Sequence, residues 1–197
     1  MSCLLGMDCI KTFYALGHQV LKECFPGLPR YEGLIKGLCR TVPTQIMILQ
    51  LLLAMSKKAC KSSLFLADAT PYPLCHNKRI FTHKVFEVLA KRGKSSMGWF
   101  YGFKLHLVTD EFGHLLALKV TSAEVNERKP FEQLLQSLKG TVVADAAYLS
   151  LELSETLAQK SLLLLTGVRK NMKKLMTRDQ HKILKSRQMI EVTFGIL

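Results

Sequence analysis

The rhythm of apolar and polar positions changes near Ser62. Before it, apolar residues follow helical spacing, which prolines interrupt within residues 25–30 and 41–45, because a proline disfavours helix in the residue before it. Thr44 is suited to cap the apolar helix that follows the second interruption. After Ser62, short apolar runs and alternating stretches predict strands. The pattern therefore predicts a helical region over residues 1–60 and a second domain over residues 61–197.

The second domain has a recognisable order of elements. From residue 62 the pattern reads strand, strand, strand, helix, strand, helix, strand, helix, with a hairpin turn around Gly113 and with Pro71 and Pro73 ending the first strand. The runs "TVVA" and "SLLLL" are apolar enough for strands covered on both faces, and helical crossovers make such strands parallel. The sequence predicts an α/β fold with a mixed five-stranded sheet flanked by helices.

Two of the predicted strands end in the same tripeptide, Ala-Asp-Ala, which holds Asp68 and Asp145. If these strands are parallel neighbours, both carboxylates lie at the carboxyl edge of the sheet, where sites in α/β folds gather. Two carboxylates repel each other, so an ionised pair needs a cation. With no Cys or His beside them, oxygen ligands favour Mg²⁺ or Mn²⁺. Catalysis by two ions generally needs a third acid.

The final predicted helix, "SRQMIEVTFGIL", contains Glu191 four residues after Arg187. Ile190 and Phe194 form its apolar stripe, and Glu191 lies on an adjoining face. Taken alone, Glu191 reads as a surface residue paired with Arg187. Asp110, Glu124 and Asp179 read as solvated acids in turns and loops.

The charge is strongly positive and uneven. The formal net charge is +13, from 28 Lys and Arg against 15 Asp and Glu. Residues 76–106 hold seven basic residues and one acid, and residues 169–187 hold eight and one. A single basic run is usually a solvated face, but two of them beside isolated strand aspartates favour a polyanionic partner such as nucleic acid.

Other features restrict the cell compartment. The six cysteines form no Cys-x-x-Cys pair, which argues against a zinc site and favours reduced thiols. The N-terminus lacks the basic and apolar pattern of a signal peptide. The most apolar window, Ile46–Met55, contains Gln50 and is shorter than a membrane span. We therefore expect a cytoplasmic protein with no membrane partner.

The arrangement of Asp68, Asp145 and Glu191 resembles the DDE triad of bacterial insertion-sequence transposases, whose catalytic domain is RNase H-like. The segment "CHNKRIFTHKVFEVLAKRGKSSMGWFYGFKLHL" is similar to the block that follows the first aspartate in one branch of that family. The resemblance extends from about Tyr31 to the last residue, and this block, residues 75–107, is its most specific part.

The resemblance implies a metal-dependent transposase. Asp68, Asp145 and Glu191 would be the catalytic acids and would bind two Mg²⁺ or Mn²⁺ ions, with Arg187 as catalytic support. The substrate would be double-stranded DNA, both the terminal inverted repeats and the target, bound by a homodimer. Trp99 and Phe100 could stack on a base, although a core position is more typical at the start of a strand. The residues expected to hold DNA phosphates are Lys78, Arg79, Lys91, Arg92, Lys94, Arg169, Lys170, Lys173 and Lys174.

The sequence departs from the family pattern in several places. Asp145 is followed by Ala146-Ala147-Tyr148, where relatives have Lys-Gly-Tyr, and Leu184 replaces a tyrosine that can precede Arg187. Relatives also continue past the position of Leu197, so we expect a C-terminally truncated copy or a fragment. Two alternatives stay open: an inactive DNA-binding remnant of a transposase, and an RNase H-like nuclease that cuts without regard to inverted repeats.

Overall fold

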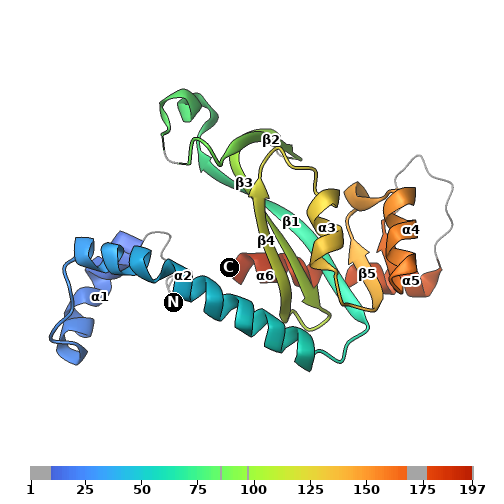
Figure 1. The fold of residues 1–197 in the computed structure, drawn as a ribbon, viewed down its shortest axis with the longest axis horizontal. Coiled ribbons are helices and arrows are strands. Elements are labelled where there is room, and N and C mark those ends of the chain that lie inside the picture. The colour runs from blue at the N-terminus through green and yellow to red at the C-terminus, as the bar shows by residue number, and fades with distance from the viewer. Residues whose placement is uncertain (1–9, 85, 97, 168–176, 197) are drawn as a thin grey trace. The chain divides into compact units, whose positions relative to one another are not determined.

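The computed structural model describes residues 10–84, 86–96, 98–167 and 177–196 (Figure 1). The chain divides into two compact units, one over residues 1–54 with 195–197 and the other over Met55–Phe194. The predicted domain boundary at residue 60 stays a prediction.

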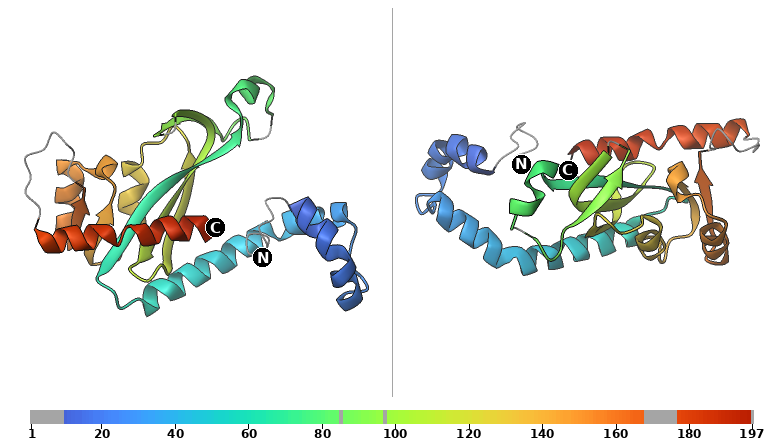
Figure 2. Two further views of the ribbon diagram at one scale, coloured as in Figure 1. Left: turned by 180° about the vertical axis from the view of Figure 1, so that it is seen from behind. Right: turned by 90° about the horizontal axis from the view of Figure 1, so that it is seen from above.

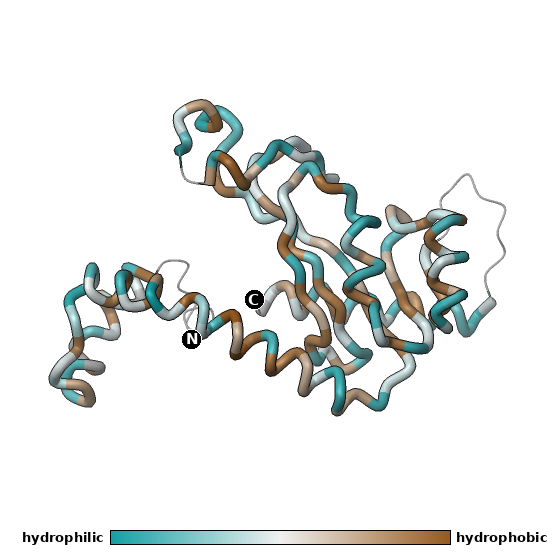
Figure 3. The backbone as a smooth tube through the Cα atoms, in the orientation of Figure 1, coloured by the Kyte–Doolittle hydropathy of each residue, from teal (hydrophilic) through white to brown (hydrophobic). Residues whose placement is uncertain are grey.

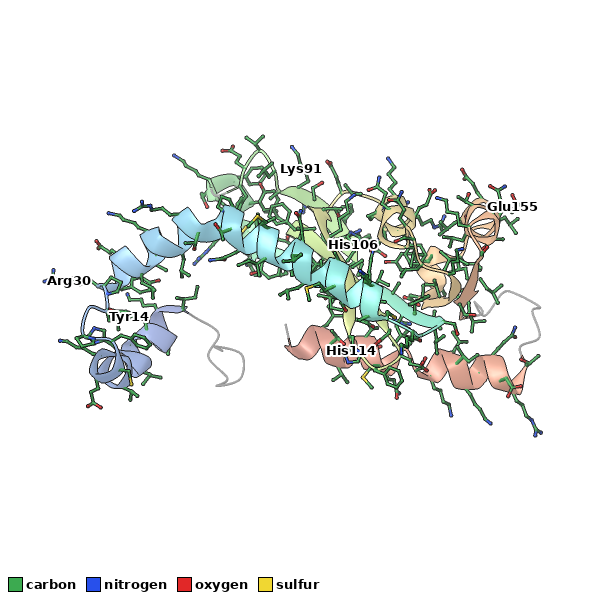
Figure 4. All side chains as sticks on the ribbon, turned by 60° about the horizontal axis from the view of Figure 1, so that its bottom comes forward. Tyr14, Arg30, Lys91, His106, His114 and Glu155 are labelled. Carbon is green, nitrogen blue, oxygen red and sulfur yellow. The ribbon has the colours of Figure 1, made fainter. Side chains whose placement is uncertain are left out.

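The first unit consists of helical segments. Helix α1 spans Ile10–Cys24, and α2 spans Tyr31–Ala59, continuing into the second unit. The Tyr14 hydroxyl donates to the carbonyl of Pro29 at 2.7 Å, one residue before Arg30, which ties α1 to the connection between the helices (Figure 4). This hydrogen bond links the first helix to the short connection that leads into the second.

Helix α2 passes through Pro43 without a break, so the predicted helix start at Thr44 is wrong. A proline removes one backbone hydrogen bond, but the helix survives where the flanking turns hold. Here the Thr41 hydroxyl donates to the carbonyls of Gly37 and Leu38 at 3.2 and 3.0 Å, and the Gln45 amide donates to that hydroxyl at 2.9 Å. These side-chain contacts support the turns on both sides of the proline.

Helix α2 extends well beyond the apolar window Ile46–Met55 that was noted in the sequence. Its 29 residues include an 18-residue window with mean hydropathy 1.4, so its length and composition would allow it to cross a membrane. Apolar residues recur along it (Figure 3). None of this window is buried in the structure. The core helix of a soluble protein and a signal sequence near the N-terminus satisfy the same criteria of length and composition, so the absence of a membrane partner stays a prediction.

The second unit is built on a mixed sheet, which confirms the predicted α/β class. The strand order is β2-β3-β1-β5-β6, and β4 pairs with β3. β5 is parallel to β1 and to β6, while the other pairs are antiparallel. The strands are β1 (Leu64–Cys75), β2 (Lys91–Ser95), β3 (Gly98–Asp110), β4 (Leu115–Ser122), β5 (Gly140–Ala144) and β6 (Leu162–Thr166).

Two strands differ from the prediction. β2, a sixth strand, was missed because its charged residues lack an apolar alternation. β1 continues past Pro71 and Pro73 to Cys75, where the sequence predicted its end. Prolines are tolerated there because β1 pairs with β5 only over Leu64–Leu66 and is paired with β3 alone beyond.

Helices cover both faces of the sheet. α6 lies on one face, and α3 and α4 lie on the other (Figure 2). The helix predicted at the end of the chain, over residues 186–197, corresponds to α6, whereas α5 lies in the stretch before it that was predicted as a loop. The helices of this unit, including short 3-10 turns, are η2 (Asn77–Thr82), α3 (Arg128–Leu134), η3 (Ala146–Tyr148), α4 (Leu151–Gln159), α5 (Arg178–Lys185) and α6 (Gln188–Ile196).

Each face has its own apolar core, because side chains alternate across a strand. Phe65 and Val142 belong to the core that contains Phe131 of α3. Leu66 and Val143 belong to the core that contains Ile190 of α6, which is fully buried. Burying a side chain of this size stabilises the fold by about 1.5–3 kcal/mol. Ile190 therefore anchors α6 on the face to which even-numbered residues of β1 point.

Candidate functional site

The register between β1 and β5 decides where the two aspartates lie. Leu66 is paired with Val143, and both belong to the core under α6. Asp68 and Asp145 each follow two residues later, so alternation turns both carboxylates to the α6 face, at matching positions beyond the last paired residues. The predicted neighbourhood of the two strands is confirmed.

Arg187 joins the two carboxylates. One terminal nitrogen of its guanidinium, Nη1, lies 3.2 Å from Oδ1 of Asp145, and the other, Nη2, lies 3.4 Å from Oδ2 of Asp68. Arg187 comes from the junction between α5 and α6, which Ile190 and Phe194 hold against this face. Residues far apart in the chain thus meet just beyond the last paired residues of β1 and β5; Asp145 follows the end of β5, whereas Asp68 lies within β1 rather than at its predicted end.

Each aspartate also accepts a hydrogen bond from the next backbone N–H. The Ala69 N–H donates to Oδ1 of Asp68 at 2.9 Å, and the Ala146 N–H donates to Oδ1 of Asp145 at 2.6 Å. The side chain of Asp68 is 16% exposed and that of Asp145 is 47% exposed. Burial raises the pKa of Asp68 and the charge of Asp145 adds to this, while the Ala69 N–H and Arg187 act in the opposite direction.

The turn after Asp145 is held in place by contacts with α3. Tyr148 is buried and its ring lies against that of Phe131, with centroids 4.5 Å apart. Burial raises the pKa of Tyr148, helped by the charges of Glu127 and the two aspartates. Arg128 donates to the carbonyl of Ala147 at 3.0–3.1 Å and to that of Leu149 at 3.0 Å. The backbone that presents Asp145 is therefore held although Ala146 and Ala147 replace the family's usual residues.

Glu191 does not join this pair. It lies in the first turn of α6, directly after the buried Ile190, and is exposed. Within residues 10–84, 86–96, 98–167 and 177–196, no three Asp, Glu, His or Cys side chains lie close enough together to hold a metal ion. The structure brings two of the three predicted acids together, and the role of Glu191 stays a prediction.

The donor set of the pair fits a hard divalent cation. Both groups are carboxylates, they already face one cation, and Mg²⁺ commonly uses only one or two protein carboxylates. Asp68 and Asp145 are therefore compatible with a divalent ion between them.

The predicted DNA-binding residues divide into two groups. Lys78 and Arg79 in η2, and Lys91, Arg92 and Lys94 on β2, are exposed (Lys91 is labelled in Figure 4). The remaining four, Arg169, Lys170, Lys173 and Lys174, lie outside the described residues.

A basic pocket lies beside β2 and close to the turn after Asp145. Its volume is about 490 Å³, and its lining includes the basic residues Arg92, Lys94, Lys104 and Arg128, the acids Glu124 and Glu127, and Trp99 and Ala147. Trp99 is 56% exposed, so its predicted core position is wrong, whereas Phe100 is buried as expected. The guanidinium of Arg92 lies 5.6 Å from the centroid of the Trp99 ring, which is a cation–π distance. The pocket reaches the turn after Asp145 through Ala147, while Asp68, Asp145 and Arg187 are not among its lining residues.

Three polar residues were missed or misread in the sequence. Asp110 is buried rather than solvated. Lys104 is also buried and pairs with Glu127 at 3.1 Å. The link between Arg128 and the turn after Asp145 had no local signal either, because it joins residues 19 and 21 positions apart. Glu124 and Asp179 are exposed, as predicted.

Comparisons with known proteins identify the family of the chain. No curated protein matches the chain. A cryo-EM structure of a piggyBac transposase synaptic complex with hairpin DNA is similar, with a TM-score of 0.43 and 14% sequence identity, over 66% of this chain and 28% of that chain. The family model described as the transposase DDE domain matches residues 58–197. That match covers most of the sequence, and the chain therefore belongs to the family of DDE-domain transposases.

Proposed function

We propose that this chain is an insertion-sequence transposase that catalyses metal-dependent cleavage and strand transfer of double-stranded DNA. The observation that carries the proposal is the pair of carboxylates, Asp68 and Asp145, which share one cation just beyond the parallel pairing of β1 and β5. Acids with a purely structural role seldom lie beside a second acid, because each negative charge makes ionisation of the other less favourable. The family match supports the same reading.

Asp68, Asp145 and Glu191 would hold Mg²⁺ or Mn²⁺, two ions in all. When bound, such ions activate an attacking oxygen and stabilise the leaving oxygen at phosphorus. The protein supplies the rigid edge: the Ala69 and Ala146 N–H groups orient the two aspartates, and Arg128 fixes the turn behind Asp145. Glu191 lies one turn after Arg187, and its part in ion binding requires the DNA-bound state.

The exposed basic residues of η2 and β2 would bind DNA phosphates, and this binding would weaken with salt because it releases counterions. The pocket beside Trp99 would receive a base of the bound DNA, since an exposed aromatic ring can stack on a base of any identity. We further propose terminal inverted repeats and target DNA as substrates, a homodimer on DNA, and a cytoplasmic location.

Cleavage of DNA that carries the element's terminal repeats tests the proposal directly. With Mn²⁺ the wild-type chain should nick the repeat ends, and Asp68→Asn should reduce the rate at least about 10³-fold, because one ion ligand is lost. Asp179→Asn is the matched control, since Asp179 is an exposed acid on α5. Equal rates for wild type and Asp68→Asn would contradict the proposal.

A second function is favoured by one observation: Glu191 stands apart from the two aspartates. In that case the chain is a DNA-binding remnant without catalysis. It would retard DNA in a gel and show no Mn²⁺-dependent rise in melting temperature, whereas the active enzyme shows both. Cutting that ignores the terminal repeats would instead indicate an RNase H-like nuclease.

A further inference from the structure

Arg187 occupies the space that both aspartates face. Its two terminal nitrogens point to different acids, one to Asp145 and one to Asp68, so a single guanidinium compensates two carboxylates. The side chain of Arg187 is 30% exposed, which leaves part of this cluster shielded from water. A cation placed there and a metal ion bound by the same oxygens would repel each other strongly.

The fit of the guanidinium is incomplete. Charge-assisted N–H···O bonds are typically about 2.7–2.9 Å long, whereas these two contacts measure 3.2 and 3.4 Å. Neither acid receives the paired, parallel bonds that an arginine can give one carboxylate. The Nε atom of Arg187 is buried and has no hydrogen-bond acceptor among the described residues. A buried donor without a partner costs free energy, so this arrangement holds the guanidinium weakly.

The backbone position of Arg187 permits its side chain to leave. Arg187 lies in the junction between α5 and α6 and contributes its carbonyl to the Ile190 N–H at 3.0 Å. The anchor of α6 is Ile190, in the core below, and does not involve the guanidinium. The side chain can therefore move away while both helices keep their packing.

We propose that Arg187 is a placeholder cation, which balances the charges of Asp68 and Asp145 in the metal-free protein and withdraws when divalent ions bind. This inference rests on the proposed metal site. It assigns to Arg187 a positioning role before catalysis: it keeps the two acids facing one point, at the cost of competing with the ions for them. The apparent metal affinity of the chain is then lower than the acids alone would give.

Titration calorimetry with Mn²⁺ and no DNA tests this without measuring cleavage. Arg187→Gln should bind Mn²⁺ about tenfold more tightly than wild type, because the competing charge is gone. Arg187→Lys keeps the charge but cannot span both acids, and should show a smaller gain. Arg178→Gln removes an exposed arginine of α5 and controls for net charge. Unchanged or weaker binding by Arg187→Gln overturns the inference.

Asp68→Asn separates this failure from that of the proposed function. If wild type does not bind Mn²⁺, or if Asp68→Asn binds it equally well, both the proposed metal site and the placeholder role are wrong. If that binding is present but Arg187→Gln does not strengthen it, only the placeholder role falls.

A measurement on the wild-type protein avoids dependence on folded variants. The Nε–H proton of Arg187 is buried and should exchange slowly in the metal-free protein. With saturating Mg²⁺, NMR should show its exchange rate rise at least about tenfold, since withdrawal exposes this group to water. An exchange rate that Mg²⁺ leaves unchanged would contradict withdrawal.

Discussion

Two acidic sites in the same sheet differ in how their charge is compensated. Asp110, at the end of β3, is 4% exposed and accepts from the Phe112 and His114 N–H groups at 3.0 and 2.9 Å, with the His114 ring 2.8 Å from its second oxygen. All these partners lie within four residues. Asp68 and Asp145 instead share Arg187, which lies 119 and 42 residues away.

The difference separates a structural acid from a functional candidate. Asp110 is satisfied by its own turn, so its hydrogen bonds form as soon as the hairpin closes. Asp68 and Asp145 place like charges together and draw on one shared, distant cation at long contact distances. A fold gains nothing from such an arrangement that hydrophobic side chains could not provide better, which points to selection for chemistry.

The largest effect expected from this comparison concerns Glu191. If Glu191 completes the site, Glu191→Gln should reduce Mn²⁺-dependent cleavage about 10³-fold, equivalent to about 4 kcal/mol, since it removes an ion ligand. Its free energy of unfolding should stay within about 0.5 kcal/mol of wild type, because the side chain is exposed. Glu155→Gln, an exposed glutamate on α4, is the control (Glu155 is labelled in Figure 4). Cleavage by Glu191→Gln at the wild-type rate would mean that Asp68 and Asp145 bind the ions without Glu191.

The next effect should appear at Asp110, with the opposite signature. Asp110→Ala removes the acceptor of the Phe112 and His114 N–H groups, which are part-buried, and should destabilise the protein by about 1–2 kcal/mol. Chemical denaturation measures this change. Mn²⁺ affinity of the folded variant should match that of wild type. A loss of Mn²⁺ binding at full stability would erase the distinction between the two acidic sites.

A smaller, pH-dependent effect is expected from His106, another satisfied polar group. Its side chain is 1% exposed and lies 2.9 Å from the Thr121 hydroxyl. Burial, with the charges of Lys104 and Lys119, lowers the pKa of His106 to about 4 from 6.5. The unfolded chain then binds more protons between these values, so stability is complete above pH 6.5 and is lost as the pH falls toward 4.

Between pH 7 and pH 5 this linkage amounts to about 2 kcal/mol. Denaturation midpoints across this range should decline less steeply in His106→Gln than in wild type. His181→Gln, which changes an exposed histidine on α5, serves as the control and should follow the wild-type slope. Identical slopes for wild type and His106→Gln would mean that the buried ring does not govern acid stability.

Much of the second unit could be predicted because its signals are local. Apolar runs identified β1, β3, β4, β5 and β6, and the crossover helices implied that β1 and β5 are parallel. That inference alone placed Asp68 beside Asp145. β2 could not be predicted, because a charged strand that is paired only through its backbone leaves no apolar pattern.

The contacts that complete the site were beyond local reasoning. Arg187 lies between α5 and α6 and reaches the aspartates through the packing of both helices on the sheet, and no proline or glycine marks the break between them. The pairing of Lys104 with Glu127 and the exposure of Trp99 likewise depend on how distant segments pack. The position of Glu191 relative to the aspartates depends on the same packing.

The pairing of Leu66 with Val143 sets a rule for length changes in this protein. Deleting one residue from the stretch between Leu64 and Asp68 would turn the aspartate toward α3, although the composition would hardly change. Deleting two residues would turn the Asp68 side chain back toward α6 but would shorten the part of β1 that pairs with β5. Lineages descended from this gene should therefore tolerate substitutions in these strands far better than single-codon insertions or losses.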